Sequence, residues 1–263
     1  MSSEEFQPSE NTTRENAPSS SLQAGELGGK LAGLTLPRQV LALALWPFLQ
    51  NMMGVAVGFA DMMIAGRMEK GKSVEAEAMM DTMGASMYLM WLLMILQGAM
   101  GTGAMALVSR STGARDMKSA NLALGQSILL GVGTGMISGV MIWMIVPYMG
   151  QFFGLSDLAQ EYVTDYMRMG ALLAPFSGVL FVASSCLRAY GDTMKPFWAM
   201  FLVNVVNVAA SLYCVYELGW GVKGLAAGTV VGWAAGAVMI LWFLRPNSKV
   251  RREAGDEIPL ELR

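Results

Sequence analysis

An all-α integral membrane fold, a bundle of six transmembrane helices, is the fold class that this sequence predicts. Hydrophobic residues make up 54% of its 263 residues, charged residues make up only 14%, and the mean hydropathy is +0.44. The charges cluster between apolar blocks, each long enough to cross a hydrocarbon core of about 30 Å at about 1.5 Å per helical residue. The alternating ten-residue segments typical of a transmembrane β-barrel do not occur in this pattern.

The six apolar blocks follow one another with short polar connections. They predict spans at residues 37–65, 79–108, 120–147, 162–187, 195–216 and 222–244. In the first span, Pro47 removes one backbone hydrogen bond, so we expect a kink or hinge there. The third and sixth spans carry a glycine at every fourth position, which predicts close packing against neighbouring helices. These glycines are Gly131, Gly135 and Gly139, and Gly224, Gly228, Gly232 and Gly236.

Polar segments flank the predicted membrane unit, residues 36–244. Residues 1–35 are rich in Ser, Glu, Asn and Gly and are too polar to fold alone, so they predict a disordered tail. This tail lacks the pattern of a cleavable secretory signal, so we expect the first span to be retained. Residues 245–263 are charged and predict a second tail or the start of a linker.

The positions of Lys and Arg predict the orientation, because cytoplasmic loops are enriched in them. Of the 18 basic residues, Arg67, Lys70, Lys72 and Lys223 fall on one side and Arg168 lies within the fourth span. The other basic residues all fall on the side that holds both termini. We therefore predict a multi-pass protein of the cell membrane with both tails in the cytoplasm.

Asp61 lies toward the cytoplasm-distal end of the first span, in an otherwise apolar run. An Asp at the centre of a membrane helix costs about 2.5–3.5 kcal/mol on insertion scales, whereas each Leu, Val, Ile or Phe returns only about 0.3–0.6 kcal/mol. Such an acid is by default a candidate for ion transport, and a hydrogen bond between helices is the other interpretation. Gly58, Gly54 and Gln50 share its helix face. They leave room for water, a cation or a flat substrate, or for close packing.

Asn204, Asn207 and Ser211 form a second polar stripe, on the fifth span, at spacings of three and four residues. Three polar groups on one face predict a common partner. One hypothesis places the stripe opposite Asp61 across a cavity, where amide oxygens coordinate Na⁺ or hydrogen-bond a protonated acid. The alternative is hydrogen bonding between helices, worth under about 1 kcal/mol per bond.

Other chemistry is poorly supported. Asp165 and Arg168 are three residues apart at the outer start of the fourth span, which predicts a local ion pair. The chain has no histidine, and Cys186 and Cys214 lie in separate spans without metal-ligand spacing, which argues against a zinc site. No Gly-Lys-Ser/Thr phosphate loop indicates ATP hydrolysis. We expect no cofactor, no nucleic-acid partner and no enzymatic reaction.

Three loop segments carry a family resemblance. They read LRAYGDTMKP at 187–196, ALVSR with GARD at 106–110 and 113–116, and GVKGLAAGT at 221–229. The first combines a tight Gly turn, an Asp or Thr helix cap and a Pro in the first turn of the next helix. In their order along the chain, between six spans, these segments resemble the N-terminal half of the multidrug and toxic compound extrusion (MATE) transporters over residues 37–244. GFAD at 58–61, followed by AGR at 65–67, is also similar to the first helix of that family.

The resemblance implies a lobe of a Na⁺- or H⁺-coupled antiporter that exports organic, often cationic, compounds. It implies that Asp61 is the coupling acid, that Asn204 and Asn207 match asparagines of the family motif, and that Ser211 stands where one branch carries a second acid. Gly54 occupies the position of the family's usual amide. The expected cation and substrate residues are Asp61, Asn204, Asn207, Ser211, Gln50 and Gly54.

The family is built from two six-helix lobes, with the substrate site between repeats. This chain matches one lobe, so we expect it to work as a homodimer or with a separate second lobe, or to be an inactive truncated half. A flippase for lipid-linked intermediates is the nearest rival, although it favours more basic residues inside the spans. An intramembrane aspartyl protease needs two facing acids, and a purely structural module needs only the glycine stripes.

Overall fold

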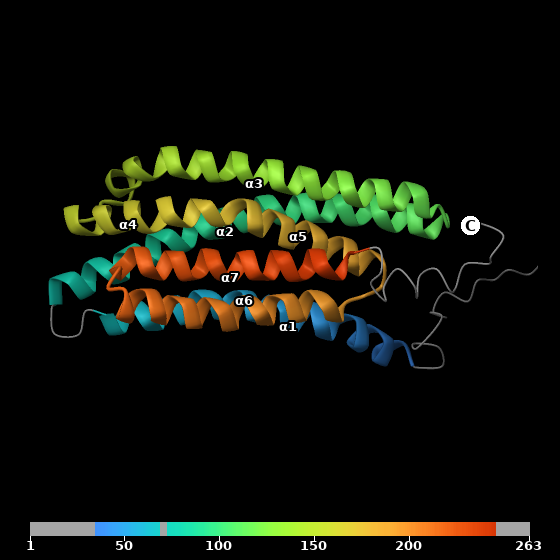
Figure 1. Cartoon of the computed structure of the whole chain (residues 1–263), viewed down its shortest axis with the longest axis horizontal. Coiled ribbons are helices and arrows are strands. Elements are labelled where there is room, and N and C mark those ends of the chain that lie inside the picture. Colours follow the sequence, from blue (N-terminus) through green and yellow to red (C-terminus); the bar gives the residue numbers. More distant parts are fainter. Residues whose placement is uncertain (1–34, 69–72, 246–263) are drawn as a thin grey trace, which may run out of the picture. The chain divides into compact units, whose positions relative to one another are not determined.

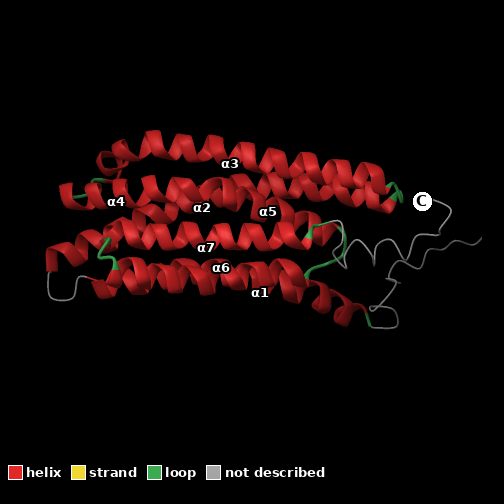
Figure 2. Ribbon diagram, in the orientation of Figure 1, coloured by secondary structure: helices red, strands yellow, loops and turns green. Residues whose placement is uncertain are grey.

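The structure, a computed structural model, describes residues 35–68 and 73–245. Every regular element in this part of the chain is helical (Figure 2). The chain divides into two compact units, residues 1–43 and 44–263, and the described part of the first is the beginning of helix α1. The predicted tails, 1–35 and 245–263, lie outside the described residues except for Thr35 and Arg245.

Six helical segments are long and apolar enough to cross a membrane, which confirms the predicted spans for the described residues. The elements are α1 (Leu36–Met68), α2 (Ser73–Gly113), α3 (Met117–Phe153), α4 (Asp157–Gly170), the 3-10 turn η2 (Ala171–Leu173), α5 (Ala174–Ala189), α6 (Met194–Leu212), the π-helical turn η3 (Tyr213–Glu217) and α7 (Gly221–Phe243). Helices α2 and α3 extend beyond the predicted apolar blocks at both ends.

The fourth predicted span, residues 162–187, lies within one candidate membrane span, Asp157–Ala189, which contains a 3-10 turn. Helix α4 ends at Gly170, three residues form the 3-10 turn η2, and α5 begins at Ala174. Pro175 follows in the first turn of α5, where its missing N–H removes a bond that would continue α4. Gln97 of α2 donates to the Ala174 carbonyl at 2.9 Å and so holds this joint.

Two of the three loop motifs act as helix caps. Between α5 and α6, Gly191 adopts the left-handed conformation with φ 87°, and Asp192 Oδ1 accepts from the backbone N–H groups of Met194 and Lys195. The capping side chain is therefore that of Asp192, while Thr193 stands at the N-cap position without a side-chain hydrogen bond to the helix. Before α3, the side-chain and backbone groups of Ser119 donate to Asp116, and these bonds lower the pKa of the Asp116 carboxyl.

Helices α6 and α7 lie side by side (Figure 1), and the glycine stripe of α7 faces α6. A Cβ atom added at Gly232 would lie 2.8 Å from the Val203 carbonyl oxygen and 2.9 Å from the Asn207 Cβ. Helix α3 packs in the same way, because a Cβ at Gly139 would lie 2.7 Å from the Ala171 carbonyl oxygen. The predicted close packing through both stripes is confirmed.

Large apolar side chains remain exposed on the outer faces of the helices. On α3, Leu129 is 72% exposed and Phe152 is 81% exposed. Patches of this kind are rare on soluble monomers and are expected where a helix faces lipid. The fold therefore fits a membrane environment by its surface as well as by its helix lengths.

Candidate functional site

Asp61 is buried, with 3% of its surface exposed, and its carboxylate accepts three side-chain hydrogen bonds. Thr229 donates to Oδ2 at 2.7 Å, Tyr166 donates to the same oxygen at 3.3 Å, and Asn207 donates to Oδ1 at 3.1 Å. Both carboxylate oxygens are thus satisfied from neighbouring helices. A buried carboxylate with three donors is a built site rather than an accidental contact.

The three donors come from three different spans. Tyr166 lies near the end of α4, Asn207 lies in α6 and Thr229 lies in α7. The close α6–α7 packing brings the last two together, and Asn207 Nδ2 also donates to Thr229 Oγ1 at 3.0 Å. The site therefore joins the first, fourth, fifth and sixth spans through one acid.

The hydrogen bonds leave two groups able to rearrange. The Thr229 hydroxyl has one hydrogen and two acceptors in reach, Asp61 Oδ2 at 2.7 Å and the Leu225 carbonyl at 3.1 Å. Asn207 Oδ1 is buried without a hydrogen-bond partner among the described residues. A proton on Asp61 would let Thr229 donate to Leu225 instead, and a cation would find oxygen atoms close by. The network can accept positive charge without leaving a donor unsatisfied.

Each hydrogen-bond partner of Asp61 in the described part of the chain is uncharged. Two basic residues at this end of the unit, Lys223 and Arg168, are engaged elsewhere. Lys223 pairs with Asp165 at 3.1 Å, and the Arg168 guanidinium lies 5.0 Å from the centre of the Trp143 ring. The predicted local pair of Asp165 with Arg168 is therefore wrong, because Lys223 of α7 takes the carboxylate.

The three residues of the polar stripe on the fifth span do not share one partner, and the alternative interpretation, hydrogen bonding between helices, holds for Asn204 and Ser211. Only Asn207 reaches Asp61, and it does so by direct contact. Asn204 donates to the Met53 and Met200 carbonyls, both at 2.9 Å, and Ser211 donates to the Leu225 carbonyl at 3.3 Å. Residues on one helix face lie at different depths, so each meets a different neighbour.

Gln50 and Gly54 lie outside the first contacts of Asp61. Gln50 accepts from Arg188 at 2.8 Å and donates to Ser184 at 3.4 Å. Gly54 faces α6, where an added Cβ would lie 3.7 Å from the Met200 methyl group. Sequence reasoning grouped both with Asp61 by helix face, and the structure separates them along the helix.

Sequence reasoning missed Tyr166 and Thr229, which supply two of the three bonds to Asp61. A signal for Thr229 was present, because it follows Gly228 in the glycine stripe that presses α7 against α6. For Tyr166 the sequence signal was its place beside Asp165 in an amphipathic segment, and this pattern does not indicate which face of the helix lies toward α1.

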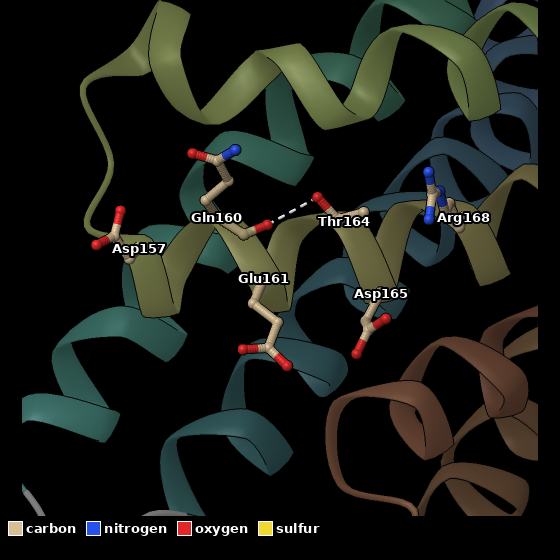
Figure 3. Close-up of a pocket in the computed structure, with 6 residues that line it drawn as sticks. All are labelled: Asp157, Gln160, Glu161, Thr164, Asp165 and Arg168. Carbon is tan, nitrogen blue, oxygen red and sulfur yellow. Dashed lines mark hydrogen bonds between the residues drawn. The ribbon is translucent and has the colours of Figure 1, made fainter.

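A surface hollow of about 420 Å³ lies along α4, and Asp61 is not among the residues that line it. Its lining residues are Asp157, Gln160, Glu161, Thr164, Asp165 and Arg168. In Figure 3 the carboxylates of Glu161 and Asp165 point away from Gln160, which extends from the opposite side of the helix. All six residues come from one helix, so the hollow is a stretch of open helix surface rather than an enclosed binding site.

Comparison with known proteins assigns this arrangement to a family. The MatE family model matches residues 47–212, which include Asp61, Tyr166 and Asn207. The multidrug export protein MepA of Staphylococcus aureus is 24% identical over 180 residues, covering 67% of this chain and 39% of MepA. The chloroplastic Protein DETOXIFICATION 44 of Arabidopsis thaliana is 26% identical over 129 residues, covering 49% of this chain and 23% of its own length.

Solved structures show the same fold. The MATE transporter VcmN of Vibrio cholerae, in its bent form, superposes with a TM-score of 0.71 at 16% identity, covering 82% of this chain and 47% of that chain. A transporter of the MOP superfamily from Pyrococcus furiosus gives 0.70 at 18% identity, covering 83% and 50%. The chain thus spans about half the length of these structures and less of the curated relatives. Because the MatE family model matches more than half of the residues of this chain, the chain belongs to the MatE family of membrane transporters.

Proposed function

We propose that this chain is one lobe of a cation-coupled exporter of organic, often cationic, compounds, and that Asp61 binds the coupling ion. The observation that carries the proposal is the buried Asp61 carboxylate, whose hydrogen-bond partners in the described residues are all uncharged. A buried membrane carboxylate without a counter-charge is expensive, so it favours taking up a cation. Because the chain belongs to a transporter family, we infer that the bound cation drives the export of an organic compound.

Antiport follows from the single charge of the site. When Asp61 holds Na⁺ or H⁺, its charge is neutralised and an organic cation nearby loses its electrostatic attraction. When the ion leaves, the attraction returns. The ion and the organic cation each favour the conformation that binds them better. Binding and release of the ion at Asp61 therefore shift the protein between two conformations, and the ion and the organic cation are exchanged.

The two coupling ions would use the site differently. A proton would sit on a carboxylate oxygen, and Thr229 would turn its hydrogen toward the Leu225 carbonyl. A sodium ion would draw on oxygen atoms of Asp61, Thr229 and Tyr166, and a rotated Asn207 amide would add Oδ1, which lacks a partner in the described residues. Proton binding and sodium binding would involve the same residues, so an experiment is needed to identify the coupling ion.

A transport pathway between lobes requires a second six-helix lobe. We propose that a second copy of this chain or a separate polypeptide supplies it. We also propose that the protein lies in the cell membrane with both ends in the cytoplasm, on the strength of the distribution of Lys and Arg.

Efflux of a fluorescent organic cation from pump-deficient cells that express this chain tests the proposal. We expect export that Asp61→Asn abolishes and that Asp81→Asn leaves intact, because Asp81 is an exposed acid at the outer part of α2. Export that survives Asp61→Asn would remove Asp61 from the mechanism. Absence of export from an inserted chain would contradict a self-sufficient homodimer, and co-expression with a second lobe would then decide between a split transporter and an inactive half.

A further inference from the structure

Few buried side chains connect α1 to the rest of its unit. Between residues 44 and 68, the buried ones are Val57, Asp61, Ile64 and Ala65. Hydrogen bonds add three attachments along the same helix. Gln50 bonds to α5, the Met53 carbonyl accepts from Asn204 of α6, and Asp61 bonds to its three donors. The position of Asp61 therefore depends on a small number of polar contacts.

Arg188 makes the attachment farthest from Asp61. Its Nη1 donates to Gln50 Oε1 at 2.8 Å, and its Nη2 donates to Ser185 Oγ at 2.9 Å. None of the ion pairs found among the described residues includes Arg188, and the neighbouring Asp192 pairs with Lys195 at 2.6 Å. Arg188 lies in the last turn of α5, where the negative end of the helix dipole stabilises its charge.

The amide of Gln50 is oriented from both ends. Its Oε1 accepts from Arg188, and its Nε2 donates to Ser184 at 3.4 Å. Hydrogen bonds to a charged donor are stronger than neutral ones, so the bond from Arg188 is the firmest of this group. Gln50 and Asp61 are eleven residues apart, which is about three turns, or roughly 16 Å, along nearly the same face of α1. A rotation of α1 at Gln50 would turn Asp61 away from its donors.

We propose that Gln50 and Arg188 are positioning residues for the cation exchange, because their contact sets the rotation and height of α1 against α5. The contact contains no exchangeable ion, so it persists while the bonds at Asp61 change with the charge of that residue. The effect on exchange rests on the proposed function, whereas the effect on α1 does not.

A cysteine reporter on α1 tests the structural part. Val57 lies between Gln50 and Asp61 and is 5% exposed, so Val57→Cys in a Cys186→Ala, Cys214→Ala background reacts slowly with a water-soluble maleimide. We expect Gln50→Leu and Arg188→Gln each to speed its labelling roughly three- to tenfold. The double variant should be no faster than either alone, because both changes remove one contact. Gln50→Glu keeps an acceptor for Arg188 and should preserve slow labelling.

A second reporter separates positioning from general loosening. Val163→Cys on α4, at 1% exposure, should label equally slowly in all these variants. Unchanged labelling at Val57, or an equal increase at Val163, would overturn the proposal. If Arg188→Gln does not accumulate in the membrane, Gln50→Leu and Gln50→Glu decide the question, since both keep Arg188.

The cation response tests the functional part. We expect Gln50→Leu to shift the ion concentration for half-maximal stabilisation at least threefold, and Gln50→Glu to restore it. The shift should be upward for Na⁺, which loses oxygen ligands, and downward for H⁺, because the ionised carboxylate loses its donors. An unshifted midpoint in Gln50→Leu would overturn the positioning role. A wild-type chain with no response to either ion would instead contradict the proposed function, and the labelling result would stand by itself.

Discussion

The Thr229 hydroxyl donates a 2.7 Å hydrogen bond to Asp61 Oδ2 and so joins residues 168 positions apart in the chain. It is the shortest of the three bonds to this carboxylate, and it ties α7 to α1. Because Thr229 also reaches the Leu225 carbonyl, its hydrogen can change acceptor when Asp61 changes charge. The bond therefore couples the charge of one acid to the packing of two helices.

Removing the Thr229 hydroxyl should change the affinity for the coupling ion in a direction that depends on the ion. It should weaken Na⁺ binding, because an oxygen ligand is lost, and strengthen proton binding, because the hydrogen bond from Thr229 stabilises the ionised carboxylate. Thr229→Val keeps the shape and deletes the donor, and a hydrogen bond to a charged group is worth about 1.5–3 kcal/mol, which is roughly a tenfold change or more in affinity. The cation concentration for half-maximal stabilisation of the purified chain measures it. Thr229→Ser keeps the hydroxyl and serves as the matched control. Equal affinities for the Val and Ser variants would show that the bond plays no part in cation binding.

Tyr166→Phe should have a smaller effect than Thr229→Val. The phenol hydroxyl lies 3.3 Å from Asp61 Oδ2, and long hydrogen bonds are weak. At the roughly 0.6 kcal/mol average for membrane hydrogen bonds, the affinity would change about threefold, in the same direction as in Thr229→Val. The same titration gives the order of the two variants. A larger change in Tyr166→Phe would mean that the phenol, and not Thr229, is the main partner of the acid.

Gly232→Ala should destabilise the α6–α7 pair. The added methyl would lie 2.8 Å from the Val203 carbonyl oxygen, and overpacking of this kind costs about 1–3 kcal/mol. Thermal unfolding of the purified chain measures the loss. Gly133→Ala on α3 is the control, because nothing lies within 4 Å of its added Cβ, and it should unfold at or above the wild-type temperature. A Gly232→Ala protein as stable as the control would mean that the two helices separate easily.

The spans and the glycine contacts could be predicted because each depends on one helix at a time. Apolar length decides membrane crossing, and a run of glycines marks a face that packs closely whatever its partner. The 3-10 turn between α4 and α5, inside the fourth span, was not predicted, although Pro175 marks its position. Hydropathy treats residues 162–187 as one block, and the proline changes backbone geometry without changing hydropathy.

The site could be predicted only at its centre. Asp61 stands out because a membrane acid is costly by itself, and Asn207 stands out as a polar residue in an apolar span. The partners Tyr166 and Thr229 depend on how α4 and α7 are rotated against α1, which one sequence does not give. The same reason explains three residues that share a helix face with Asp61 or Asn207 and yet bond to groups other than Asp61. They are Asn204, Ser211 and Gln50.

Cation binding by the purified chain, measured as thermal stabilisation during titration with Na⁺ at fixed pH and with acid in the absence of Na⁺, tests the central claim most directly. A ligand at a hundred times its Kd stabilises a protein by about 2.7 kcal/mol. We expect one of the two ions to raise the unfolding temperature of the wild type and of Asp81→Asn, and to leave Asp61→Asn unchanged. A shift of the same size in Asp61→Asn would contradict the assignment of Asp61 as the coupling acid.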